Sequence, residues 1–200
     1  EIMLQQTQVT TVVDYFNNFI ISFPTLTALA NADEGEVLAN WAGLGYYSRA
    51  RNLHKTAKII FSEYQGIVPN NYSELIALPG IGESTAGAIL SLAYNQSSPI
   101  LDGNVKRVLS RYHRVVGHYN DSKFLKELWR LAKYHTPSKQ NAKYTQAIMD
   151  LGATICVPQK PHCSECPVSR NCKANLYCDQ ASFPQKNTKT IRPEKSLAFL

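Results

Sequence analysis

Apolar residues recur with a helical period along most of the chain. Between residues 9 and 20 they fall at positions i, i+3, i+4, i+7, i+10 and i+11, one face of an amphipathic helix, and Pro24 ends this pattern. No convincing alternation of apolar and polar positions appears before Ala198. The pattern therefore predicts an all-α fold. Further helices are expected near residues 37–41, 50–61, 72–77, 84–94, 105–116, 124–133 and 142–151.

The predicted helix near residues 105–116 has two contrasting faces. Its apolar stripe is formed by Val105, Val108, Leu109, Tyr112 and Val116, and the opposite side is shared by Arg107, Arg111 and Arg114.

Glycines, prolines and polar residues divide the chain. One predicted helix ends at Gly43-Leu44-Gly45, and Leu78-Pro79-Gly80-Ile81-Gly82 separates two others. Residues 179–196 are polar, contain two prolines and are interpreted as a linker. The chain starts at Glu1 inside an expected helix and stops at Leu200 where a strand begins. We therefore interpret it as a fragment cut at both ends, with its folded region over residues 1–178.

The composition indicates a globular protein with a basic surface. The 200 residues are 44% hydrophobic, carry a formal net charge of +6 and have a pI near 9.0. This balance favours a polyanionic partner such as nucleic acid or an anionic membrane surface. No apolar run approaches the roughly 18–20 residues of a membrane span, and no signal-like segment opens the chain. A soluble intracellular protein without a membrane partner is therefore expected.

Four cysteines form a compact motif near the C-terminal end. Cys156, Cys163, Cys166 and Cys172 follow the spacing C-x6-C-x2-C-x5-C within 17 residues, while Cys178 lies outside it and is expected to be a free thiol. Four thiols this close suit a four-coordinate metal or a [4Fe–4S] cluster better than disulfides. The residues alone leave zinc and the iron–sulfur cluster as alternatives.

Three further motifs each have a structural interpretation, and the first also has a functional one. The glycines of Leu78–Gly82 permit a tight turn, and the positive end of the following helix suits a phosphate, but the same residues describe an ordinary turn between helices. Asp102-Gly103-Asn104 before an apolar run is typical of a helix N-cap. The polar run from Gln5 to Gln8 describes a solvated helix face.

Taken in order along the chain, these motifs resemble the adenine-specific DNA glycosylases of the MutY type, in the endonuclease III and helix-hairpin-helix superfamily. The resemblance covers Glu1 to about Pro184. It implies a helix-hairpin-helix at about residues 72–94, an iron–sulfur loop at 156–172 that holds a [4Fe–4S] cluster, and the start of a Nudix-like domain at 197–200. By this resemblance the partner is double-stranded DNA with adenine opposite 8-oxoguanine or guanine, and the protein is a monomer in the bacterial cytoplasm and nucleoid or in the eukaryotic nucleus.

The resemblance also assigns roles to single residues. Glu1 precedes Ile2-Met3-Leu4-Gln5-Gln6-Thr7-Gln8 and matches the general acid, and Asp102 matches the catalytic aspartate. Tyr46 matches an aromatic residue that stacks beside the damaged guanine. DNA contacts are expected from Leu4, Gln5, Gln6, Thr7, Tyr46, Arg49, Leu78, Gly80, Gly82, Ser84, Asn104 and Lys106.

Ser84 distinguishes two kinds of enzyme within the superfamily. Members that also cut the strand carry a lysine four residues beyond Gly80, and its amine forms a Schiff base with the sugar. A serine cannot form one, so we expect a monofunctional glycosylase. The alternatives are an endonuclease III-type glycosylase and lyase for oxidised pyrimidines, and a non-catalytic DNA-binding module with a four-cysteine zinc site.

Overall fold

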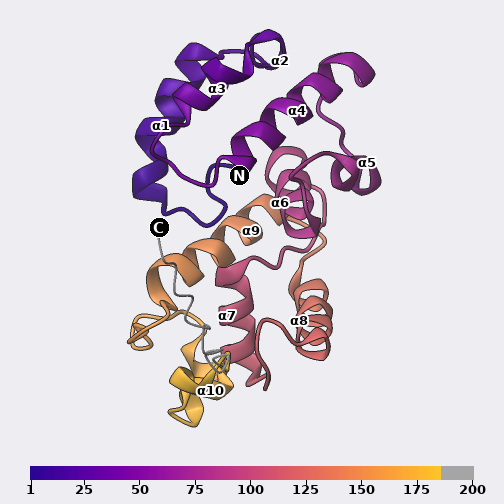
Figure 1. Cartoon of the computed structure of the whole chain (residues 1–200). Coiled ribbons are helices and arrows are strands. Elements are labelled where there is room, and N and C mark those ends of the chain that lie inside the picture. Colours follow the sequence, from indigo (N-terminus) through magenta and orange to yellow (C-terminus); the bar gives the residue numbers. More distant parts are fainter. Residues whose placement is uncertain (186–200) are drawn as a thin grey trace, which may run out of the picture. The chain divides into compact units, whose positions relative to one another are not determined.

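The computed structural model describes residues 1–185, and every regular element among them is helical (Figure 1). The all-α prediction is therefore confirmed. The chain forms two compact units: residues 1–101 with 135–147, and residues 102–134 with those from 148 onward.

The first unit contains the N-terminal helices and the hairpin region. Its elements are α1 (Val9–Ser22), α2 (Leu26–Asn31), α3 (Glu34–Asn40), α4 (Ser48–Glu63), α5 (Tyr72–Ala77), α6 (Glu83–Tyr94) and most of α9 (Asn141–Asp150). Two apolar clusters form its core, one around Trp41 and Phe19 and the other around Leu75 and Leu90.

Side-chain caps define the short helices of this unit. Thr25 accepts a hydrogen bond from the Ala28 amide at the start of α2, which the sequence pattern did not predict. Asp33 opens α3 with a capping box that includes Glu36, and Asn71 caps α5. These caps satisfy amide groups that have no partner within a helix, so even helices of six or seven residues have defined starts.

Helix α1 forms where its periodicity predicts, but most of its apolar face is not covered by the described residues. Val12 and Phe19 are buried, whereas the other positions of the stripe are exposed. These exposed residues line an open groove of about 840 Å³ that also includes Glu1. The exposed positions are Val9, Val13, Phe16 and Ile20.

The expectation that the chain starts inside a helix is wrong. Residues 2–7 form successive turns, and the first helix begins at Val9. Gln6 lies in the left-handed region at φ 57°, which a helix does not contain. The turn geometry is stabilised by contacts with α4 and the hairpin, described below.

The second unit joins two long helices to the cysteine-containing segment. Its elements are α7 (Gly103–His113), α8 (Ser122–His135), a π-helical turn η1 (Leu151–Ile155), η2 (Ser169–Asn171), α10 (Lys173–Leu176) and η3 (Gln180–Ser182). Its buried side chains include Val105, Phe124, Leu128 and Phe183.

Helix α7 differs from its prediction at the C-terminal end and on its basic side. It ends at His113, because Arg114 adopts a left-handed conformation at φ 54°, and Val116 is 67% exposed instead of continuing the apolar stripe. Arg107 and Arg111 are buried although their positions lie opposite that stripe. Their guanidinium groups donate to backbone carbonyls of the cysteine segment, which makes burial of these charges tolerable.

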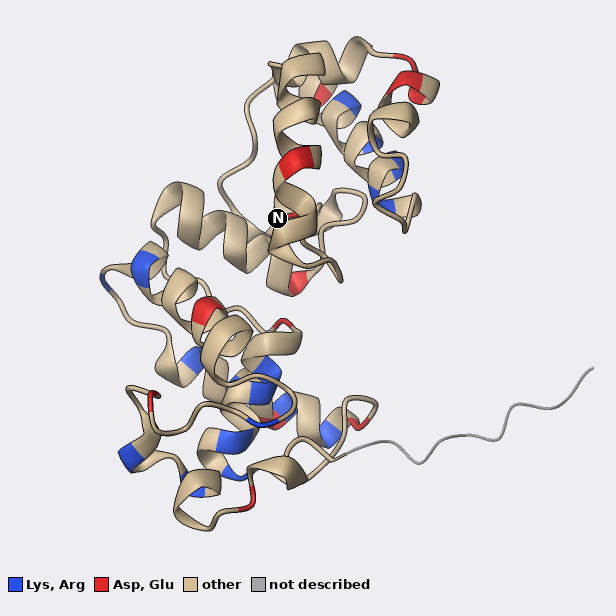
Figure 2. Ribbon diagram, turned by 90° about the vertical axis from the view of Figure 1, so that its left-hand side faces the viewer, with Lys and Arg blue, Asp and Glu red and all other residues tan. Residues whose placement is uncertain are grey.

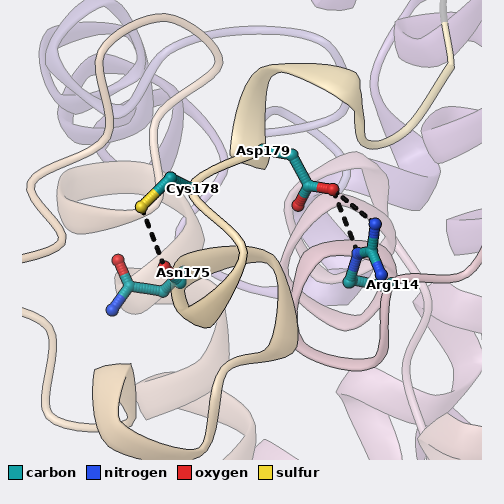
Figure 3. Close-up of polar contacts among 4 residues, drawn as sticks. All are labelled: Arg114, Asn175, Cys178 and Asp179. Carbon is teal, nitrogen blue, oxygen red and sulfur yellow. Dashed lines mark hydrogen bonds and ion pairs between the residues drawn. The ribbon is translucent and has the colours of Figure 1, made fainter.

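The start of the expected linker is part of the folded unit. Arg114 donates to one carboxylate oxygen of Asp179 through both Nε and Nη2, at 3.1 and 2.6 Å (Figure 3). Phe183 is buried, and the Arg114 guanidinium also lies 4.3 Å from the ring centroid of Tyr177. The rest of the expected linker, 186–196, and the expected domain start at 197–200 lie outside the described residues. Within the described part, no helix has the length and apolar character needed to cross a membrane.

Candidate functional site

The turn that carries Glu1 is attached to the hairpin of the same unit. Glu1 is exposed and its carbonyl accepts a hydrogen bond from the Leu4 amide at 3.1 Å. The amide nitrogen of the Gln5 side chain donates to the Gly80 carbonyl at 3.3 Å and to the Thr85 hydroxyl at 3.2 Å. Leu4 is 38% exposed and Gln6 is exposed, while Thr7 is half-buried. Glu1 is thus presented at the surface by a turn that the hairpin supports.

Arg49 lies beneath this turn and does not face solvent. Its side chain is buried, with 7% of the residue exposed, and its guanidinium donates to five backbone carbonyls. Desolvation by burial lowers the pKa of the Arg49 guanidinium, while the nearby Tyr46 raises it. The Arg49 side chain is therefore engaged in internal hydrogen bonds, and its DNA contact stays a prediction. The accepting carbonyls belong to Ile2, Met3, Gln5, Leu44 and Gly45.

Tyr46 projects from a strained turn next to Arg49. Its φ is 49°, in the left-handed region that disfavours residues with a Cβ, and 60% of its surface is exposed. The Arg49 guanidinium lies 5.5 Å from the Tyr46 ring centroid and 5.3 Å from that of Trp41. Trp41 also donates its indole N–H to the Gly45 carbonyl at 3.1 Å. The ring of Tyr46 is therefore accessible at the surface.

The hairpin between α5 and α6 is shaped by glycine and supported by α4. Gly80 has φ +78°, and a Cβ there would lie 2.8 Å from the Cβ of Asn52. The Thr56 hydroxyl donates to the Pro79 carbonyl at 2.8 Å. Leu78 is buried in the apolar cluster around Leu75, so its side chain packs inside and is not available to DNA.

Helix α6 begins at Glu83, and its N-cap residue Gly82 provides no side-chain hydrogen bond. Gly82 is exposed, and a Cβ on it would meet no atom within 4 Å. The first amides of a helix have no partner inside it. Together with the helix dipole, they make this end suitable for an anion.

Ser84 has a structural task that the sequence did not reveal. Its hydroxyl accepts a hydrogen bond from the Leu101 amide at 2.9 Å. Leu101 directly precedes Asp102, so Ser84 fixes the backbone that leads into the aspartate.

Asp102 is the N-cap of α7, as its structural interpretation predicts. Its carboxylate accepts from the Val105 amide at 2.8 Å, and the residue is half-buried. Asn104 accepts from the Arg107 guanidinium at 2.9 Å, and the Lys106 ammonium lies 5.9 Å from the Tyr119 ring centroid.

The four cysteines of the motif line one cavity in the second unit. Burial raises the pKa of the Cys163 and Cys172 thiols. Arg111 donates to the Cys156 sulfur at 3.4 Å, and the Gln180 side chain donates to the Cys163 sulfur at 3.6 Å. Hydrogen-bond donors directed at a sulfur atom favour its thiolate form. The cavity is lined by Cys156, Cys163, Cys166 and Cys172.

Four thiols around one cavity suit either a four-coordinate metal ion or an iron–sulfur cluster. Zinc holds its sulfur ligands at about 2.3 Å in a tetrahedron, so four zinc-bound thiolates lie close together. A [4Fe–4S] cluster is likewise held by four Cys thiolates. Cys178 is exposed, as predicted; its thiol faces the Asn175 carbonyl at 3.7 Å (Figure 3).

Positive charge is distributed unevenly along the chain. No lysine or arginine precedes Arg49, and Figure 2 shows α1 and α2 without basic residues. In the cysteine segment Lys160, Arg170 and Lys173 are exposed. These three side chains are free to meet a polyanion, whereas Arg107 and Arg111 are engaged internally.

The chain resembles several known proteins. It is 46% identical over 200 residues to an adenine DNA glycosylase of Buchnera aphidicola subsp. Acyrthosiphon pisum, covering 100% of this chain and 57% of that protein. It is 43% identical over 181 residues to the human adenine DNA glycosylase, covering 90% of this chain and 33% of that protein. The chain thus spans little more than half the length of the first of these curated relatives.

A solved structure and a family model agree with the described fold. The structure of a thermostable thymine-DNA glycosylase superposes with a TM-score of 0.77 at 27% identity, covering 88% of this chain and 82% of that one. The model for the HhH-GPD superfamily of base excision DNA repair proteins matches residues 1–134. The helical architecture, the hairpin and this match together show that the chain belongs to the HhH-GPD superfamily of base excision DNA repair proteins.

Proposed function

We propose that this protein hydrolyses the N-glycosidic bond of adenine mispaired with 8-oxoguanine or guanine in double-stranded DNA, and leaves the strand uncut. The observation that carries the proposal is the similarity to adenine DNA glycosylases over 90% or more of this chain, which includes the Glu1 turn, the hairpin and the Asp102 cap. The exposed start of α6 supports a phosphate contact that positions DNA without reading its sequence.

In this proposal adenine leaves the base stack before reaction. Unstacking costs a few kcal/mol and is easiest at a mispair, which contributes to selectivity. The exposed ring of Tyr46 stacks on the strand opposite the adenine, and Leu4 with Gln6 occupies the space that the base leaves. All three side chains are accessible in the structure.

Glu1 and Asp102 have different roles in the proposed reaction. Glu1 donates a proton to N7 of the extruded adenine, which makes the base a better leaving group. The C1′–N9 bond then breaks, its electron pair goes to the base, and the ionised carboxylate of Asp102 stabilises the cationic sugar. Water adds at C1′ and loses a proton. One acidic and one ionised carboxyl group play parallel roles in O-glycosidases.

The cysteine cavity would hold a [4Fe–4S] cluster through Cys156, Cys163, Cys166 and Cys172. Such a cluster supplies four metal–sulfur links that order the segment between residues 156 and 172. The ordered segment displays Lys160, Arg170 and Lys173 towards phosphates. Neither the four cysteines nor these three basic residues take part in breaking the N-glycosidic bond.

Ser84 disfavours the alternative of a glycosylase and lyase for oxidised pyrimidines. Its hydroxyl cannot form a Schiff base, and in the structure it accepts the Leu101 amide hydrogen. Strand cleavage by the protein is therefore not expected.

The test is a single-turnover reaction of the iron-loaded protein with duplexes that carry adenine opposite 8-oxoguanine, adenine opposite thymine, or thymine glycol. We expect adenine release from the first duplex only, with strand breaks that appear only after alkali. Strand cleavage of the thymine glycol duplex without alkali would refute the proposal and support the lyase. DNA binding with no base release from any duplex would support a binding module.

A further inference from the structure

Arg49 joins two surface turns that lie about 40 residues apart in sequence. Through Nη1 it donates to the Ile2, Met3 and Gln5 carbonyls of the Glu1 turn, including 2.7 Å to Met3. Through Nη2 it donates to the Leu44 and Gly45 carbonyls, at 3.4 and 3.2 Å, in the turn that carries Tyr46. One planar group therefore fixes both turns at the same time.

The turn that carries Tyr46 depends on this arrangement. Gly43, Gly45 and Tyr46 all have positive φ, and Tyr46 lacks the freedom of glycine. Such a conformation persists only where its surroundings enforce it. The Arg49 guanidinium beneath the Tyr46 ring and the Arg49 amide, which donates to the Tyr46 carbonyl at 2.9 Å, provide that enforcement.

The bonding of Arg49 is not optimal for stability alone. Its Nε is buried and has no hydrogen-bond partner among the described residues, which is costly for a buried donor. Unsatisfied groups of this kind call for an explanation beyond packing. The five carbonyl contacts of the two terminal nitrogens account for the residue if the task is to align two turns.

We propose that Arg49 is a positioning residue that holds the turn bearing Glu1 and the exposed ring of Tyr46 in one fixed arrangement. A shift of the Tyr46 turn on DNA then also shifts the Glu1 turn. In catalytic terms this inference rests on the proposed function, because it makes engagement of the opposite strand by Tyr46 and protonation by Glu1 interdependent.

The first test is a double-mutant cycle between Arg49 and Tyr46, read as the single-turnover rate of adenine release at saturating protein. Arg49→Lys keeps the charge but replaces the planar fork with a point charge. We expect Arg49→Lys and Tyr46→Ala each to slow release by about 10- to 100-fold, with duplex affinity changed less than the rate. The double variant should release adenine at most about threefold more slowly than the slower of the two single variants, because both changes break the same coupling.

Arg51 provides a matched control on the same helix. It is exposed and pairs with Glu34 at 3.3 Å, outside both turns. Arg51→Lys should release adenine within about twofold of wild type and combine multiplicatively with Tyr46→Ala. If the Arg49 and Tyr46 effects multiply in the same way, or if Arg49→Lys reacts at the wild-type rate, the inference is wrong.

A second measurement does not depend on catalysis. Amide hydrogen exchange should speed up at Leu4, Gln5 and Leu44 together in Arg49→Lys, and at none of them in Arg51→Lys. Arg49→Met, which removes all donors, should show the larger change. Failure of the wild type to release adenine would defeat the proposed function, yet the exchange data would still decide the role of Arg49. Unchanged exchange, or faster exchange in one turn only, would overturn the inference.

Discussion

At the scale of single residues, Asp102 combines a cap with a charge, and substitutions separate the two. Asn caps helices about as well as Asp, whereas Ala costs about 1 kcal/mol. Asp102→Asn should therefore keep the melting temperature and slow adenine release, because its amide cannot stabilise a cationic sugar. Asp102→Ala should slow release and also lower the melting temperature by about 2–4 °C.

Thermal melting and single-turnover release on the same preparations check this prediction. The two variants share one backbone position, so their difference isolates the cap from the charge. Asp102→Asn that melts as wild type and also releases adenine at the wild-type rate would limit Asp102 to capping.

The buried arginines show which side-chain environments the sequence pattern does not predict. Arg49 was expected to contact DNA, and Arg107 was placed opposite the apolar stripe of its helix, but both are buried. Periodicity assigns a charged residue to the polar side, because it takes no account of carbonyl groups brought close by distant segments. Arg107 meets the Gly152 and Cys156 carbonyls, 45 and 49 residues away in sequence. Asp102 as a cap and Cys178 as a free thiol were predictable, since each depends on local sequence or on spacing.

At the scale of elements, the cysteine segment is expected to depend on its metal. Cys163→Ala removes one of four thiols around the cavity and should abolish the visible absorbance of an iron–sulfur cluster. Because binding of a structural metal is coupled to folding, the melting temperature should fall by about 10 °C or more. Absorbance spectra, iron content and thermal melting measure these effects.

Cys178→Ser is the control for this experiment, since Cys178 is exposed and outside the motif. It should retain both the absorbance and the melting temperature. A wild-type protein that contains zinc in place of iron, or a Cys163→Ala protein that keeps its full iron content, would contradict the cluster assignment.

The end of α7 is expected to be stabilised by the segment that follows α10. Asp179→Asn weakens its contact with Arg114, whose guanidinium also packs over Tyr177 and lies near Phe183. The pair is partly exposed, with 37% and 26% of the two side chains accessible, so its loss should cost only about 1 kcal/mol. Urea unfolding should detect this decrease, and high salt should diminish it. A larger loss, unaffected by salt, would show that the role of Asp179 is not an ion pair.

Helix positions were predictable where apolar periodicity was long, and less so at their ends. The helix α5 agrees with its expected bounds of 72–77, whereas α2 depends on the Thr25 cap and was missed. The sequence of residues 2–7 lacks a helix breaker and so predicts a helix, whereas its turn conformation depends on contacts with Arg49. That a segment is helical follows from its local sequence, but the residue at which the helix begins or ends depends on contacts that the sequence pattern does not contain.

At the scale of the whole molecule, the order of the motifs along the chain is that of the family, and the helical fold agrees with membership of that family. The sequence does not predict that the chain divides into two compact units, of which one starts at Glu1 and the other at Asp102. It also does not show that most of the apolar face of α1 stays exposed. Both features depend on packing between distant segments, which a periodic pattern cannot specify.

Glu1 is the proposed proton donor for adenine release, and the whole mechanism depends on it. The most direct measurement is the single-turnover rate of free adenine formation by wild type, Glu1→Gln and the exposed control Glu63→Gln, with duplex affinity measured for each. General acid catalysis contributes about 10²- to 10⁴-fold, so Glu1→Gln should slow release by at least about 100-fold while binding the duplex within about threefold of wild type. Glu63→Gln should match wild type. Adenine release by Glu1→Gln at the wild-type rate would contradict this role for Glu1.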